Sequence, residues 1–160
     1  MRKIIFIGQA MPRFKRNLHD WPSLNKWLYS IGLTDEYIKN NFYFSALVDY
    51  FPGSIGGSHK VPTRDEISKE RKRLEKTIKA FSPDIVVCIG KLSLSYCLQQ
   101  KIDKLDKHIG NKYKVDPYGI YGQEVDVLPL PHPSGASTWY KKKENYKLLL
   151  KALKLLKDNL

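Results

Sequence analysis

The sequence predicts an α/β protein, a three-layer sandwich with a central, mostly parallel sheet of four strands. Short apolar runs without polar alternation are typical of parallel strands that are buried on both faces. Segments with helical spacing of apolar residues separate these runs, and such an alternation is typical of helices packed on both sides of a sheet. The expected strands are residues 4–7, 42–48, 85–89 and 125–130.

The size and composition of the chain fit one globular domain over residues 1–160. A chain of this length can bury a sizeable core, and 42% hydrophobic with 28% charged residues is ordinary for a soluble protein. The net charge of +12 favours a polyanionic partner such as nucleic acid. Most of the basic residues are lysine, so a lysine-rich proteome is an equally good explanation of the charge.

Neither the cysteines nor the apolar segments indicate a secreted or membrane protein. Two cysteines do not make a disulfide framework, and we interpret Cys88 and Cys97 as buried small side chains. The N-terminus enters a strand without a signal-peptide pattern, and no apolar segment approaches membrane-spanning length. We therefore expect a cytoplasmic protein with no membrane partner, and a monomer.

Two helices are expected between the first and second strands. Asp20 can cap a helix that takes Pro22 into its first turn, and Gly32 ends this helix. Thr34 caps a shorter helix that runs through Ile38. The inward face of the first helix consists of apolar residues at helical spacing: Leu24, Trp27, Leu28 and Ile31.

A loop and a long helix join the second and third strands. Residues 54–58 are rich in glycine and serine but lack the Lys-Ser/Thr ending of a nucleotide P-loop, so we expect a mobile connection there. Thr63 and Glu66 fit a capping box, and Pro83 breaks the helix that follows. The expected inward residues of this helix are Ile67, Leu74, Ile78 and Phe81.

The last third of the chain is less regular. Residues 92–98 are expected to be helical, whereas residues 101–123 give no clear pattern. The last helix starts near Lys143. Its expected inward stripe is Tyr146, Leu149, Leu150, Leu153 and Leu156.

The stretch from Leu128 to Ser137 carries the strongest sign of a functional site. Prolines hold the chain extended as it leaves the fourth strand, so His132, between Pro131 and Pro133, stands at a stiff tip. Small residues follow the histidine and allow the backbone to approach a ligand. We favour a functional histidine over the alternative of a capped structural turn.

Four segments in fixed order resemble the uracil-DNA glycosylase superfamily. Gly8-Gln9-Ala10 matches its first loop, residues 62–66 and 85–90 look like its middle, and His132-Pro133-Ser134 matches its second active-site loop. The resemblance spans nearly the whole chain. It implies a four-stranded parallel sheet with a DNA groove across the carboxyl ends of the strands.

The resemblance also implies an activity. The protein would be a monofunctional DNA glycosylase that hydrolyses the N-glycosidic bond of uracil or another deaminated or damaged base during base-excision repair. It would act on single- or double-stranded DNA and need neither a metal nor another cofactor. The iron–sulfur branch's cysteines are absent from this chain.

The chemistry of base release explains the residue types in these loops. The base leaves as an anion, so a donor aimed at its oxygen stabilises charge that grows in the transition state, and a neutral His132 imidazole suits this role. Backbone N–H groups of Gln9 and Ala10, next to Gly8, would bind the other edge of the base. Phe14 or Trp21 would supply the stacking face.

A second group of residues would contact the DNA. Arg13, Lys15 and Arg16 form a basic loop with one aromatic, suited to a phosphate backbone, although such loops are equally common as solvated surface. Small and basic residues around the second loop would contact phosphates as well: Ser134, Gly135, Ser137 and Lys141.

Two positions depart from the pattern implied by the resemblance. Several branches carry an aspartate where this chain has Ala10, and the strand asparagine that reads the uracil edge falls at Ala46, with Ser45 as the polar residue beside it. Asp49 is the nearest carboxylate that could handle the attacking water. The alternatives are therefore a catalytically silent protein that binds nucleic acid, and an enzyme acting on a nucleoside or nucleotide.

Overall fold

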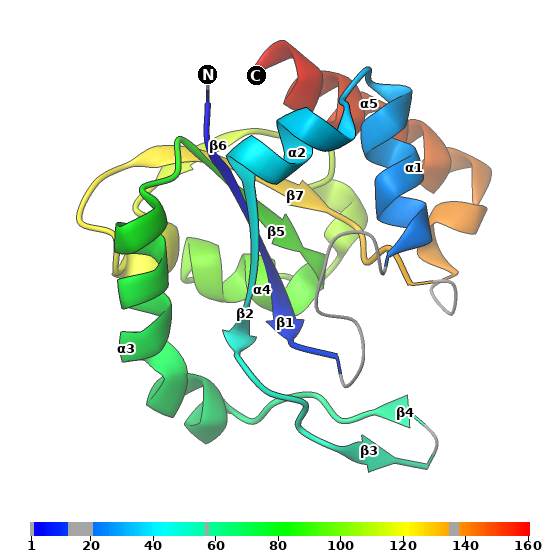
Figure 1. Ribbon diagram of the computed structural model, residues 1–160. Helices are drawn as coiled ribbons and strands as arrows, with labels where there is room; N and C mark the ends of the chain where they lie inside the picture. Colours follow the sequence, from blue (N-terminus) through cyan, green and yellow to red (C-terminus); the bar gives the residue numbers. More distant parts are fainter. Residues whose placement is uncertain (1, 13–20, 57, 135–137) are drawn as a thin grey trace.

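The computed structural model describes residues 2–12, 21–56, 58–134 and 138–160, and in it helices cover both faces of a central sheet (Figure 1). Within these residues the sheet has five strands, in the order β2-β1-β5-β7-β6. Four of them run parallel: β1 (Ile4–Ala10), β2 (Phe42–Val48), β5 (Ile85–Ile89) and β7 (Val125–Leu130). The α/β sandwich and all four predicted strands are confirmed.

The fifth strand is a correction to the prediction of four. Strand β6 (Tyr113–Val115) pairs antiparallel with β7, so that Lys114 lies opposite Asp126. It is three residues long, lies at the edge of the sheet and exposes Lys114. Such a strand has no continuous apolar run, which is why residues 101–123 gave no strand pattern.

Each layer of helices covers one face of the sheet. Helices α1 (Pro22–Ser30), α2 (Asp35–Asn41) and α5 (Lys143–Asp158) share a hydrophobic core with Ile4 and Phe6 of β1. Helices α3 (Arg64–Phe81) and α4 (Gly90–Leu98) pack on the other face, in a core with Ile5 and Ile7. Successive strand residues point to opposite faces, so residues 4–7 of β1, which are buried on both faces, all have apolar side chains. Short 3₁₀ helices complete the chain: η2 (Leu105–Lys107), η3 (Pro117–Gly119) and η4 (Trp139–Lys141).

The predicted helix boundaries follow from local chemistry. The Thr34 hydroxyl accepts a hydrogen bond from the Tyr37 N–H, and Thr63 and Glu66 form both halves of the capping box. Gly32 adopts the positive φ of +88° that a glycine reaches without strain, just after α1 ends. Asp20, the predicted cap of α1, lies outside the described residues.

Two members of the predicted inward stripe of α5 are exposed. Tyr146 and Leu150 are 49% and 48% exposed, whereas Leu149, Leu153 and Leu156 are buried. Successive helical residues are rotated by roughly 100°, so Leu150 lies on the flank of a stripe centred on Leu149 and Leu153. The prediction was wrong for both residues, and for Leu150 the reason is that it treated the leucine run as one face.

The glycine- and serine-rich segment forms a small hairpin. Strands β3 (Ser54–Ile55) and β4 (Ser58–His59) pair antiparallel after β2. The hairpin projects beyond the carboxyl end of β2 (Figure 1). Ile55 is 68% exposed on it. The segment expected to be an irregular connection is therefore hydrogen-bonded in part.

Candidate functional site

The sheet opens between β1 and β5 at the carboxyl ends of its strands. The ladder between β1 and β5 ends at the pair Ile7–Cys88, while β1 stays paired with β2 as far as Ala10–Val48. The chain after β1 goes to β2 on one side, and β5 then returns on the other side of β1. This is a topological switch point, where open α/β sheets bind ligands.

A hollow lies at this switch point and brings together the two loops that the sequence singled out. Its volume is about 20 Å³. The lining residues come from the first loop, the residue before α1, the middle of β2, the end of β5 and the loop after β7: Gly8, Gln9, Ala10, Met11, Pro12, Trp21, Phe44, Ser45, Ile89, His132 and Pro133. The volume is close to the 10–15 Å³ or so that one water needs, so the hollow must widen before a nucleobase can enter.

The imidazole of His132 is oriented by its own loop. The backbone N–H of Ser134 donates to His132 Nδ1 over 3.1 Å. A neutral ring that accepts at Nδ1 carries its proton on Nε2, so Nε2–H is the donor of this imidazole. The Trp21 ring packs edge-on against it, with 5.3 Å between centroids and 75° between planes.

Two aromatic residues hold the His132 loop against the helices. The Tyr140 hydroxyl donates to the Ser134 carbonyl oxygen over 3.2 Å. The Tyr140 ring packs on Trp27 of α1 at 5.6 Å in a T-shaped arrangement. Nothing in the sequence signals this contact between Tyr140 and α1.

The first loop continues along β2 past the end of its ladder with β5. Gly8 pairs with Ala46, Ala10 pairs with Val48, and the Met11 N–H donates to the Val48 carbonyl over 3.2 Å. Gly8, Gln9 and Ala10 are all half-buried. A Cβ atom at Gly8 would have no neighbour within 4 Å, so the glycine leaves space next to the hollow.

Strand β2 contributes Phe44 and Ser45 to the lining. The Phe44 ring stacks on Phe6, with 5.6 Å between centroids and 4° between planes. The Ser45 hydroxyl accepts a hydrogen bond from Arg73 Nη1 over 3.0 Å. Sequence reasoning missed Phe44, because inside an apolar strand nothing distinguishes an aromatic that faces a ligand site from one in the core.

Arg73 fixes the outer edge of β2 beside the hollow. In addition to Ser45, its guanidinium donates to the carbonyl oxygens of Ala46 and Leu47, over 2.7 and 3.1 Å. Sequence reasoning gave no role to Arg73, which lies among the many charged residues of α3. Its contacts follow from the tertiary packing of α3 on β2.

Among the described residues, two further predicted site residues are not brought to the hollow. Asp49 is exposed and does not line it; its backbone N–H donates to Glu70 Oε1 over 2.7 Å. Lys141 is exposed in η4. The remaining predicted residues lie outside the described residues: Arg13, Phe14, Lys15, Arg16, Gly135 and Ser137. The roles proposed for all of these residues stay predictions.

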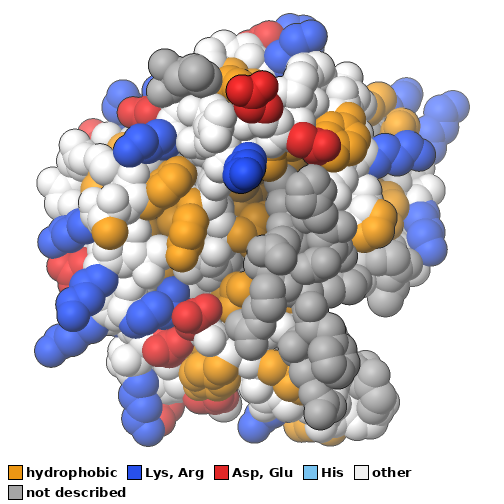
Figure 2. Space-filling model, in the orientation of Figure 1, with side chains coloured by type: hydrophobic (Ala, Val, Ile, Leu, Met, Phe, Trp, Pro, Cys, Tyr) orange, Lys and Arg blue, Asp and Glu red, His pale blue; other side chains and the backbone are white. Residues whose placement is uncertain are grey.

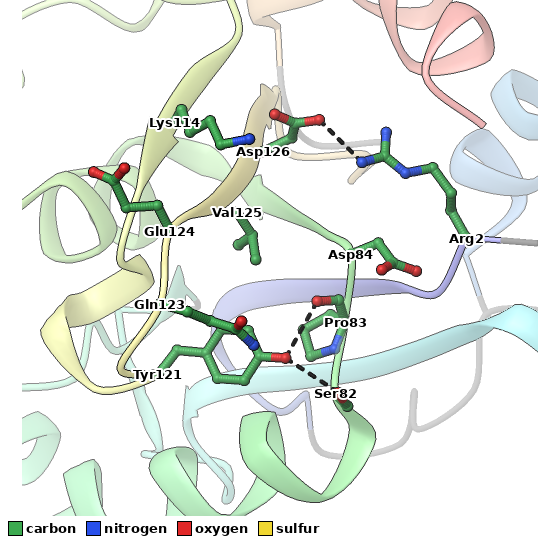
Figure 3. A pocket seen from close by; sticks show the side chains of 10 residues that line it. All are labelled: Arg2, Ser82, Pro83, Asp84, Lys114, Tyr121, Gln123, Glu124, Val125 and Asp126. Carbon is green, nitrogen blue, oxygen red and sulfur yellow. Dashed lines mark hydrogen bonds and ion pairs between the residues drawn. The ribbon is translucent and has the colours of Figure 1, made fainter.

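A larger hollow of about 270 Å³ lies at the amino ends of the parallel strands (Figure 3). We call this end of the sheet the amino edge and the opposite end, with the small hollow, the carboxyl edge. The lining of the larger hollow is charged with both signs and polar: Arg2, Ser82, Pro83, Asp84, Lys114, Tyr121, Gln123, Glu124, Val125 and Asp126. Arg2 pairs with Asp126 over 3.3 Å and donates to the Asn159 carbonyl over 2.8 Å, so this edge joins the two ends of the chain.

The charged side chains of the described residues do not gather in one patch on the face that Figure 2 shows. On the face shown in Figure 2, lysine and arginine side chains are spread over the described surface and interspersed with acidic groups. Among the described residues, no three histidine, cysteine or acidic side chains form a group that could hold a metal ion. No helix within the described ranges is long and apolar enough to cross a membrane.

The described residues form a three-layer α/β protein with a hollow at its strand switch point, which His132 and the first loop line together. A family model described as the Uracil DNA glycosylase superfamily matches residues 2–157. The chain therefore belongs to the uracil-DNA glycosylase superfamily, as the resemblance of its loops predicted. Comparison with curated proteins gave no match. Membership supports a DNA glycosylase-like role in base excision.

Proposed function

We propose that the protein is a monofunctional DNA glycosylase that hydrolyses the N-glycosidic bond of uracil or another deaminated base in DNA. One observation carries the proposal: His132 and the Gly8–Ala10 loop, which are distant in sequence, line the same hollow at the carboxyl edge of the sheet. In a member of this superfamily, that convergence would place a histidine donor and backbone N–H groups around a single base.

His132 would stabilise the departing base. Cleavage of the base–sugar bond leaves negative charge on the base, and the Nε2–H group would donate to the base oxygen on which that charge develops. A donor that strengthens only as charge develops lowers the barrier, and removing such a donor typically costs about 10²–10³-fold in rate. The proton on Nε2 follows from the Ser134 N–H bond to Nδ1.

The walls of the hollow would hold the extruded base. Backbone N–H groups of Gln9 and Ala10 would face its other edge, while Trp21 and Phe44 offer aromatic surfaces on which it could stack. Taking a base out of the stack costs a few kcal/mol, least for a mismatched or single-stranded base. The hollow would therefore widen at the same step that opens the DNA.

The attacking water has one candidate base. Ala10 carries no carboxylate in the first loop, and Asp49 at the end of β2 is the acidic residue that we propose for this task. Since Asp49 does not line the hollow, the proposal requires that it acts from the rim on the sugar side of a bound nucleotide. An Asp49→Asn variant tests this role separately from that of His132.

The proposed substrate is DNA. The net charge of +12 would make binding depend strongly on salt, since lysine and arginine that neutralise phosphates release counterions. We propose phosphate contacts by Arg13, Lys15, Arg16, Ser134, Gly135, Ser137 and Lys141.

The proposal is tested with oligonucleotides that carry uracil, hypoxanthine or xanthine, as single strands and as duplexes. Abasic sites are detected by alkaline cleavage of the product. We expect release of at least one of these bases and its loss in His132→Ala. If none of the bases is released, or if His132→Ala is as active as the wild type, the proposal is wrong.

A second candidate is a catalytically silent protein that binds nucleic acid. The side chains Ala10 and Ala46, where other branches carry polar groups, and the small volume of the hollow favour it. Its signature would be salt-dependent binding of oligonucleotides without base release. Affinity that barely changes between low and moderate salt would exclude this candidate.

A further inference from the structure

A buried chain of hydroxyl groups lies directly behind the first loop of the site. Ser93 of α4 is fully buried, and its Oγ lies 2.6 Å from the carbonyl oxygen of Ile7. The hydroxyl of Tyr118, in η3, lies 2.7 Å from Ser93 Oγ, and Tyr118 is also buried. The Cys88 sulfur lies 3.6 Å from the Tyr118 oxygen.

The carbonyl group at the end of this chain fixes the direction of each hydrogen bond. A carbonyl oxygen only accepts, so Ser93 donates its single proton to Ile7, and Tyr118 must then donate to Ser93. The thiol of Cys88 is left to donate to the Tyr118 oxygen. Burial raises the pKa of Tyr118 well above its ordinary value, so this hydroxyl keeps its proton at neutral pH.

The bond to Ile7 acts on the loop that follows. The Ile7 carbonyl and the Gly8 N–H belong to one planar peptide unit, so a bond to the carbonyl sets the direction in which the loop leaves the strand. The ladder with β5 ends at Ile7, and no atom would lie within 4 Å of a Cβ at Gly8. Pairing with β2 holds one side of the loop as far as Ala10. On the side of β5, where neither strand pairing nor packing at Gly8 acts, the Ser93 hydroxyl holds the Ile7 carbonyl.

Tyr118, whose hydroxyl contacts Ser93, has an unfavourable backbone conformation. Its φ of 58° lies in the left-handed region, which is strained for a residue with a bulky side chain. The surrounding core maintains this strain. Strained residues of this kind concentrate at functional sites, where they fix a geometry that relaxed backbone would not give.

We propose that Ser93 and Tyr118 are positioning residues, whose hydrogen-bonded relay orients the Gly8-Gln9-Ala10 loop toward the bound base. Neither side chain lines the hollow, so both act through the backbone of Ile7. The effect of the relay on catalysis rests on the proposed function, whereas its effect on the direction of the loop does not.

The protein contains a matched control for the removal of the Tyr118 hydroxyl. Tyr121 is also buried, but its hydroxyl contacts Ser82 and the Pro83 carbonyl at the amino edge of the sheet (Figure 3). Tyr118→Phe and Tyr121→Phe therefore each remove one buried hydroxyl, the first behind the carboxyl edge of the sheet and the second at its amino edge. Ser93→Ala breaks the relay at its centre, and thermal unfolding shows which variants are folded.

Two measurements test the relay in the folded variants. Steady-state base release gives kcat and KM, and backbone amide NMR signals report the loop at Gly8, Gln9 and Ala10 whether or not base is released. We expect kcat to fall roughly tenfold in Ser93→Ala and about threefold in Tyr118→Phe, with KM within about twofold of wild type. The three amide signals should shift in both variants and stay in place in Tyr121→Phe.

Unchanged amide signals in Tyr118→Phe and Ser93→Ala would overturn the relay, and so would equal shifts in Tyr121→Phe. Shifted signals with an unchanged kcat would overturn its role in catalysis. If the wild-type protein releases no base, the proposed function fails, and the amide signals still decide whether the relay orients the loop.

Discussion

The two edges of the sheet differ in both size and chemistry. The amino edge holds the larger hollow, about 270 Å³, lined by charges of both signs, among which Arg2 and Asp126 pair. The carboxyl edge holds a hollow of about 20 Å³, yet two loops, a histidine and a strand switch point meet there. Volume alone would favour the amino edge. The convergence of chemically distinct groups favours the carboxyl edge, and the proposed function rests on that convergence.

The largest expected effect of a single substitution is at the carboxyl edge. His132→Ala should lower kcat/KM for base release by about 10²–10³-fold, because it removes the donor to the departing base. His108 is the control, since its ring contacts Tyr113 rather than the hollow. Equal losses in His132→Ala and His108→Ala, measured by abasic-site formation, would remove the distinction between the two edges.

Trp21 should show a smaller effect of the same kind. Trp21→Leu removes the aromatic surface next to His132, and stacking of a base on an aromatic ring is worth roughly 1–3 kcal/mol, or about 5- to 150-fold in rate. Trp27→Leu is the matched variant, because Trp27 lies in the same helix layer and packs on Tyr140. The comparison needs kcat/KM alongside the melting temperature. A greater kinetic loss in Trp27→Leu would argue against stacking on Trp21.

The amino edge should tolerate a comparable change. Asp126→Asn breaks the ion pair with Arg2, in which the side chains are 10% and 39% exposed. Pairs this exposed contribute about 0–1 kcal/mol, so we expect a small drop in the urea midpoint and base release within about twofold of wild type. A loss of base release much larger than this would mean that the amino edge takes part in function.

The smallest expected effect concerns acid stability at the start of α3. The pKa of Glu66 is lowered, mainly by its bond from the Thr63 N–H and then by Tyr50. A carboxylate whose pKa is depressed on folding stabilises the protein above its unfolded pKa and loses that contribution as pH falls through the folded value. The melting temperature should therefore fall as the pH drops below about 4.5. Glu66→Gln should flatten part of that decline, and an identical pH profile would contradict the assignment.

The sequence predicted those elements whose signals are local. Continuous apolar runs defined the parallel strands because a strand such as β1 is buried on both faces. Thr34 and Thr63 marked helix starts because a cap acts within one turn of the chain. His132 stood out because its flanking prolines restrict the backbone whatever surrounds them.

The features that escaped prediction depend on contacts between distant segments. Phe44, Arg73 and Ser93 have ordinary local sequences, and their importance arises from what packs against them in the folded state. Strand β6 escaped because three half-exposed residues at an edge leave no pattern. The stripe on α5 was misjudged because leucine is also common on the flanks of a buried face.

The hydrogen bonds of Arg73 also bear on how the outer strand β2 meets other molecules. Strand β2 is an outer strand of the sheet, and exposed outer strands can recruit a strand from another molecule and so start aggregation. By donating to the Ala46 and Leu47 carbonyls, the guanidinium occupies acceptors that an incoming chain would need. The same side chain that supports the site also protects the protein from polymerising along this border.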